Sequence, residues 1–129
     1  MTDEDLIYIG AKVISLLQKN DFNRIEKEFD YALSHGRPAG QAIEEDLNRA
    51  IVECGNVGSI DKEKIELKVS HFDPNPSQLR SLVECYCELS EGIGILVELI
   101  LSESGRVYIE DISSYSNIGE HIQSELDNA

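Results

Sequence analysis

Apolar residues recur with the 3.6-residue period of an α-helix through the first half of the chain. Ahead of them, Thr2 and Asp5 stand three apart, as the two members of a capping box do, and so indicate a helix start. The apolar positions form three runs: Leu6, Ile9, Val13, Leu16 and Leu17; Phe22, Ile25, Phe29 and Leu33; Ala39, Ala42, Ile43, Leu47, Ala50, Ile51 and Cys54. This pattern predicts three helices within residues 3–54.

Each predicted helix also has a boundary signal. Asn20-Asp21 breaks the first run, His35-Gly36 closes the second, and Pro38 suits the first position of the third. The polar side of the third run is expected to be an ordinary solvent-exposed helix face, and it consists of Glu44, Glu45, Asp46 and Arg49.

From about residue 62 the period changes to two, which is typical of half-buried strands. Polar and apolar residues alternate through 64–69, 82–89, 95–101 and 106–112. Helices followed by strands predict an α+β fold, with three N-terminal helices packed on a four-stranded antiparallel sheet at about 62–112. Asn117 is a candidate cap for a short helix in the tail, 113–129. With 129 residues and no repeat or linker, we expect a single domain, 1–129.

The charge balance is strongly acidic. The chain has 25 acidic and 11 basic residues, a formal net charge of −14, and residues 70–129 alone carry 11 acids against two arginines. Such a field repels nucleic acid and anionic membranes and attracts cationic partners, although solubility alone is the other explanation. No apolar stretch is long enough for a membrane span, and the N-terminus is acidic, so we expect a cytoplasmic protein.

Recognised signatures of catalysis or metal binding are not visible in the sequence. The three histidines lie far apart, and no phosphate-binding glycine loop or nucleophile motif occurs. Cys85 and Cys87 share one side of a strand, which predicts buried, reduced thiols rather than a disulfide, and Cys54 is expected to be buried too. We therefore expect no enzymatic activity, no cofactor and no metal.

Asp111 is the carboxylate whose position needs an explanation. Strand parity directs it inward, where an unpaired carboxylate is costly. A bulge or strand end that frees Asp111 to cap a turn at Ser113-Ser114 is favoured over an active-site acid.

The other face of the predicted sheet gathers acids and tyrosines. If the turns centre on Gly92 and Ser104, Tyr86 lies beside Glu98, and Glu98 lies opposite Glu110, with no basic residue nearby in these strands. Opposed like charges destabilise a sheet, so this is either an ordinary solvated face or a surface for a cationic protein. We favour the second interpretation, and the candidate partner-binding residues are Glu84, Tyr86, Glu88, Glu98, Tyr108 and Glu110.

The strand block 83–112, which ends in Ile109-Glu110-Asp111-Ile112, resembles a group of small uncharacterised bacterial α+β domains. In size, acidity and simplicity the whole chain is similar to immunity proteins of bacterial toxin systems, including contact-dependent growth inhibition. This resemblance implies a cytoplasmic inhibitor that binds a basic toxin domain, such as a nuclease. Immunity proteins share no common fold, so it assigns no residue.

Two alternatives remain open. Helices followed by long antiparallel strands also fit a small-molecule-binding or enzymatic domain of the nuclear-transport-factor-2-like superfamily, with its pocket between helices and sheet. The predicted inner rows are almost wholly apolar, however, whereas pockets need convergent polar groups. The third option is a subunit of a cytosolic assembly.

Overall fold

A computed structural model describes residues 1–55, 60–61 and 64–116, so the helix expected after Asn117 lies outside the described part. In that part the chain forms α1 (Asp3–Gln18), α2 (Phe22–Glu28), β1 (Asp30–Tyr31), α3 (Ala39–Glu53), β2 (Ile65–His71), β3 (Leu79–Ser90), β4 (Ile93–Ser102) and β5 (Val107–Ser116). The α+β class and the three helices are confirmed. The prediction of four antiparallel strands is wrong, because five strands form a mixed sheet.

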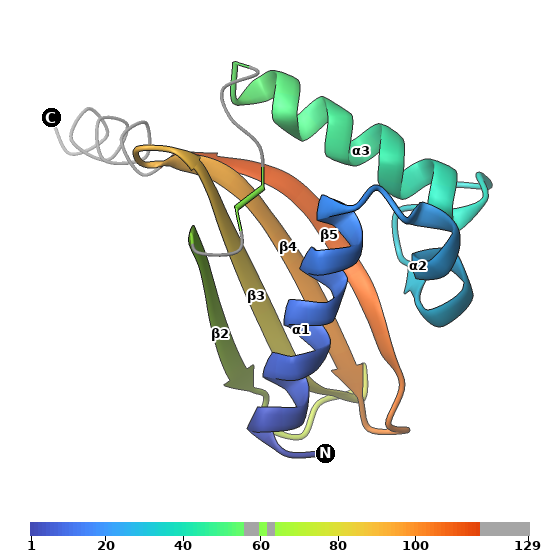
Figure 1. The fold of residues 1–129 in the computed structure, drawn as a ribbon. Coiled ribbons are helices and arrows are strands. Elements are labelled where there is room, and N and C mark those ends of the chain that lie inside the picture. Colours follow the sequence, from blue (N-terminus) through green and yellow to red (C-terminus); the bar gives the residue numbers. More distant parts are fainter. Residues whose placement is uncertain (56–59, 62–63, 117–129) are drawn as a thin grey trace, which may run out of the picture.

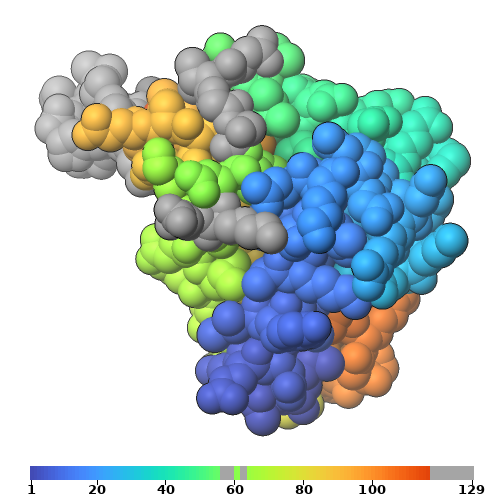
Figure 2. Space-filling model, viewed as in Figure 1, coloured from blue at the N-terminus to red at the C-terminus, as the bar shows by residue number. Residues whose placement is uncertain are grey.

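The strands are ordered β1-β5-β4-β3-β2, and only the β1–β5 pair is parallel among them. All three described helices lie on one face of this sheet, with α1 over β2 and β3 and with α3 over β5 and β4 (Figure 1). Seen from that side, the helices cover much of the sheet (Figure 2). None of the described helices combines the length and apolar character that a membrane crossing requires.

The second helix is shorter than the sequence pattern predicts. It begins with Asp21 capping the N–H of Arg24 and ends at Glu28, after which Phe29 is extended. Instead of continuing the helix, the chain forms β1 along the open edge of β5, where the Ala32 N–H donates to the Ile109 carbonyl at 2.9 Å. Backbone bonds to a sheet edge therefore outweigh the helical spacing of Phe29 and Leu33.

The core lies between the helices and the inner face of the sheet. The sheet contributes alternate residues, all buried: Val83, Cys85, Cys87, Leu89, Ile95, Val97, Leu99, Leu101, Ile109 and Ile112. Cys54, Cys85 and Cys87 are free and buried, as predicted, and burial raises the pKa of the Cys85 and Cys87 thiols to about 12. The predicted capping box is also confirmed, since Thr2 Oγ1 accepts from the Asp5 N–H and Asp5 accepts from the Thr2 N–H.

Candidate functional site

The six residues predicted to bind a partner all lie in β3, β4 and β5 on the sheet face opposite the helices. They alternate along the strands with the buried core residues and are partly exposed. We call this surface the outer face. Whether these residues bind a partner stays a prediction, but their arrangement differs from the expected one in three respects.

First, the register of the β3–β4 hairpin brings two acids directly together. Glu84 pairs with Glu98, and Tyr86 pairs with Leu96 instead of lying beside Glu98. The turn is Glu91-Gly92 alone, and Leu89 is an extra residue between the pairs Glu88–Gly94 and Ser90–Ile93. This tighter turn and the bulge together shift the register away from the one expected for a turn centred on Gly92.

Second, a bulge in β5 places Asp111 differently from both expectations for it. Glu98 pairs with Asp111 and Leu99 pairs with Ile109, so Glu110 is the extra residue. The bulge allows Ile109 and Ile112, three apart, both to face the core. A bulge is thus confirmed, but the turn at Ser113-Ser114 is wrong because β5 continues to Ser116. Asp111 belongs beside Glu98 on the outer face.

Glu84 and Glu98 form a close cross-strand pair. The Phe72 N–H donates to the Arg80 carbonyl, and the unbroken β2–β3 register therefore directs the backbone groups of Glu84 toward β2. Glu84 and Glu98 are consequently a non-hydrogen-bonded pair, the kind in which opposing side chains approach most closely. We call Glu84, Glu98, Glu110 and Asp111 the acidic row.

The electrostatics of Glu98 reflect this crowding. Partial burial, followed by the charges of Asp111, Glu84 and Glu110, raises the pKa of Glu98 above its usual value of 4.5. Each of these causes disfavours the ionised carboxylate. Within residues 1–55, 60–61 and 64–116, no three His, Cys, Asp or Glu side chains converge closely enough to hold a metal ion. The acidic row is therefore a concentration of negative charge without a built metal site.

Apolar and aromatic rows lie on both sides of the acidic row. On one side Leu82, Ile100 and Tyr108 are paired across the three strands, and on the other Tyr86 is paired with Leu96. Ile100 is only 5% exposed although it belongs to the outer face. Sequence reasoning missed these aliphatic residues, and the signal was the nearly continuous apolar run of 95–101, in which only Glu98 is polar.

The tyrosines are held in place by neighbouring side chains. The Tyr86 hydroxyl donates to Glu84 Oε2 at 2.8 Å, and this bond, more than burial, raises the pKa of Tyr86 to about 12. Its ring meets Tyr115 edge to face, with centroids 5.4 Å apart. Burial and then the charge of Glu110 raise the pKa of Tyr108. The outer face is therefore a rigid aromatic and acidic surface.

Third, basic residues do occur, at the two margins of the outer face. Lys68 on β2 pairs across the strands with Glu84, and its Nζ lies 5.2 Å from the centre of the Tyr86 ring and 3.9 Å from Glu66. Arg106 forms an ion pair with Asp30 and stacks 5.9 Å above Tyr108. The prediction of no base nearby concerned the strands that carry the acids, whereas Lys68 lies on the neighbouring β2. Between these margins the acidic row stays negative.

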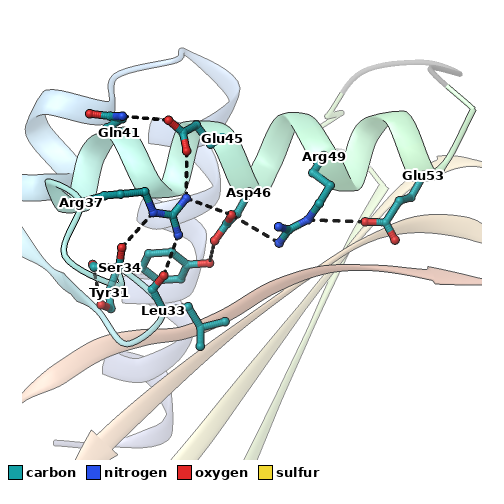
Figure 3. Close-up of polar contacts among 9 residues, drawn as sticks. All are labelled: Tyr31, Leu33, Ser34, Arg37, Gln41, Glu45, Asp46, Arg49 and Glu53. Atoms are coloured by element: carbon teal, nitrogen blue, oxygen red, sulfur yellow. Dashed lines mark hydrogen bonds and ion pairs between the residues drawn. The ribbon is translucent and has the colours of Figure 1, made fainter.

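A second polar cluster, which sequence reasoning missed, joins α3 to β1 (Figure 3). Asp46 was expected on an exposed helix face but is only 3% exposed. Its Oδ2 accepts from the Tyr31 hydroxyl at 2.5 Å, while Oδ1 lies 3.5 Å from Arg37 and 3.3 Å from Arg49. Burial, and then this bond to Asp46, raises the pKa of Tyr31.

Arg37 extends the cluster to the loop after β1. Its guanidinium donates to the carbonyls of Leu33 and Ser34, each at 2.8 Å, and to Glu45 at 2.9 Å (Figure 3). All the groups of this cluster find partners within it, which is the signature of a structural clamp. It fixes β1 beside β5, at the margin of the outer face.

Asp3, His71 and Ser81 form a contact that combines the residue types of a hydrolytic triad. The His71 ring lies 2.7 Å from Ser81 Oγ through Nδ1 and 2.8 Å from Asp3 Oδ1 through Nε2. Ser81 is only 1% exposed, so its hydroxyl cannot reach a substrate. The contact ties the start of α1 to β2 and β3.

An open cleft of about 370 Å³ lies between the α1–α2 turn and the first turn of α3. It is lined mainly by polar groups, which are Asn20, Asp21, Asn23, Gln41 and Glu44 together with Phe22 and Gly40. A Cβ at Gly40 would lie 2.9 Å from the Phe22 carbonyl oxygen, so glycine there permits the close approach of α2 and α3.

Comparisons with known proteins add no family to this description. No family model, curated protein or solved structure matches the chain.

Proposed function

We propose that this protein is an immunity protein, which binds and neutralises a basic toxin domain through the outer face of its sheet. The observation that carries this proposal is the acidic row between its two apolar and aromatic rows. Acids opposed across strands cost the free protein up to about 1 kcal/mol per pair. A cationic partner removes that cost on binding, because its charges offset those of Glu84, Glu98 and Asp111.

The surroundings of the acidic row suit a protein partner better than a solvated face. Protein interfaces combine a desolvated centre of aromatic and aliphatic side chains with charges that match those of the partner. Ile100, Leu82, Tyr108 and Tyr86 supply such groups on a rigid sheet. Binding of a partner therefore costs this surface little conformational entropy.

A basic toxin domain is the partner whose chemistry fits this surface. Nucleases and other enzymes that act on nucleic acid carry Lys and Arg at the sites that contact phosphate. An acidic protein can cover such a site, and the net charge of −14 accelerates the encounter. Inhibition of this kind requires no catalytic group on the inhibitor.

The pocket function considered as an alternative places its pocket between the helices and the sheet, whereas the open cleft of about 370 Å³ lies between the α1–α2 turn and the first turn of α3. The inner rows of β3, β4 and β5 are apolar and buried against the helices. Asp46, the buried acid beyond them, is occupied by Tyr31, Arg37 and Arg49.

Protection of cells tests the proposal. The partner to express is the basic C-terminal domain of a large secreted protein encoded immediately upstream, which is the gene order expected of a toxin system. The wild-type chain should protect cells from it. Glu98→Lys should protect at least tenfold less well, because a lysine would repel the partner, while the free variant stays folded.

Glu44→Lys is the matched control. Glu44 is exposed on α3, on the opposite side of the sheet from the outer face. Glu45 is less suitable because it is paired with Arg37. The same charge change at Glu44 should leave protection nearly intact. Equal protection by both variants would remove the outer face from the proposal, and no protection by the wild type would remove the proposal itself.

A further inference from the structure

β2 is an edge strand of the sheet: among the described residues it pairs with β3 alone, and no strand lies on its other side. The Phe72 N–H donates to the Arg80 carbonyl, and the β2–β3 register runs without a shift from Ile65–Cys87 to His71–Ser81. Backbone groups in an antiparallel strand alternate between its two sides. Those of Ile65, Leu67 and Val69 therefore point away from β3.

An open edge of this kind can pair with another strand, and proteins usually block it with prolines, bulges or charged side chains. β2 has no proline or bulge, and its two charged residues, Glu66 and Lys68, are of opposite sign. Ile65, Leu67 and Val69 are half-buried rather than fully covered, so part of this apolar row is left at the edge.

The charge of this edge distinguishes it from the rest of the molecule. Residues 61–71 contain three acids and three lysines and are formally neutral, in a chain with a net charge of −14. A second copy of the chain is repelled by most of the acidic surface of the molecule, but it can approach this neutral edge. The same neutrality gives a cationic partner little reason to choose β2.

One register makes the edge complementary to itself. A two-fold axis at Leu67 places Leu67 beside its own copy and Ile65 beside Val69 of the second copy, so all six outward backbone groups find partners. The same axis places each Glu66 opposite Lys68 of the other copy. An axis at Val69 would instead set Leu67 against His71 and form no ion pair.

We propose that the chain forms a homodimer by antiparallel pairing of its two β2 strands about Leu67. The two sheets then become one, with two backbone hydrogen bonds at each of the three residue pairs and two Glu66–Lys68 ion pairs across the axis. Because the axis is perpendicular to the sheet, both acidic rows lie on the same side of the joined sheet.

Sedimentation of the full chain tests this proposal, from about 1 µM to about 1 mM, a range that covers weak to moderate affinities. The dimer should form with rising concentration at physiological salt. Glu66→Lys places a lysine opposite Lys68 of the other copy in two pairs beside the axis, and it should weaken dimerisation at least tenfold. The double variant Glu66→Lys with Lys68→Glu restores opposite charges only in this register, and it should recover most of the affinity.

Val69→Pro separates dimerisation from folding. In the wild type the backbone N–H of Val69 points to the open side of β2. A proline at this position therefore removes no hydrogen bond to β3, and edge strands tolerate proline at such positions. The variant should melt within a few degrees of the wild type and remain monomeric. A wild type that is monomeric at every concentration, or a dimer that neither Val69→Pro nor Glu66→Lys weakens, would overturn the proposal.

Discussion

Replacing Glu98 by glutamine should stabilise the protein at neutral pH. Glutamine has nearly the same shape and removes the charge that faces both Glu84 and Asp111. Partial burial and these neighbouring acids raise the pKa of Glu98, so the folded protein holds its carboxylate less favourably than the unfolded chain does. Truncating or neutralising an interacting carboxylate usually destabilises a protein; here the opposite sign is expected.

The magnitude follows from the cross-strand geometry. One opposed like-charge pair costs about 0.2–1 kcal/mol, and Glu98 takes part in two, so the gain should be about 0.4–2 kcal/mol. For a chain of this length that corresponds to a rise of roughly 2–8 °C in Tm. The raised pKa sets the pH window: the cost is absent below the unfolded value of 4.5, and it develops as pH rises through the folded pKa.

Denaturant unfolding at a series of pH values measures this effect. The stability difference between Glu98→Gln and wild type should be positive at pH 7 and shrink toward zero below about pH 4. Glu88→Gln is the matched control, since Glu88 lies on the same face but opposite Gly94. A destabilised Glu98→Gln at pH 7, or an equal gain from Glu88→Gln, would refute the reasoning about the acidic row.

Three further predictions concern the scaffold that holds the outer face. Tyr31→Phe should lower the unfolding free energy by about 1–3 kcal/mol in chemical denaturation, because buried Asp46 loses a hydrogen bond, and an unchanged value would argue against the clamp. A thiol reagent should label Cys85 and Cys87 only on global unfolding, because both are buried and their pKa values are about 12; rapid labelling of native protein would contradict the assigned strand parity. Gly94→Ala should destabilise the β3–β4 hairpin by more than about 1 kcal/mol in thermal melts, since a Cβ there would lie 2.2 Å from the Cys87 carbonyl oxygen, and a wild-type Tm would exclude that clash.

Much of the architecture follows from periodicity in the sequence. The capping box at Thr2, the three helices and the inward rows of β3 and β4 could be predicted because each depends on residues close in sequence. β1 could not. Asp30-Tyr31 lies inside a helical pattern and becomes a strand only because the edge of β5, some 80 residues later, offers backbone partners.

The sequence predicts which residues lie on the outer face but not which of them are paired across the strands. Alternation places Glu84, Glu98 and Glu110 on one face whatever the register. Which residues oppose one another depends on the bulges at Leu89 and Glu110. A carboxylate at the inward position of Asp111 indicated the second bulge, but the pattern of polar and apolar residues fixed neither its exact place nor the bulge at Leu89. Asp46 was missed for a related reason: its polarity indicates exposure unless Tyr31 and Arg37 are known to surround it.

The rate of association with the toxin domain, measured by stopped flow as salt is raised, tests the central claim most directly. If the acidic row binds a basic surface, the rate should fall steeply as the screening length contracts from about 30 Å at 0.01 M to about 8 Å at 0.15 M. Glu98→Lys should slow association at low salt far more than Glu44→Lys does. A rate independent of salt, or equal slowing by the two variants, would contradict the claim.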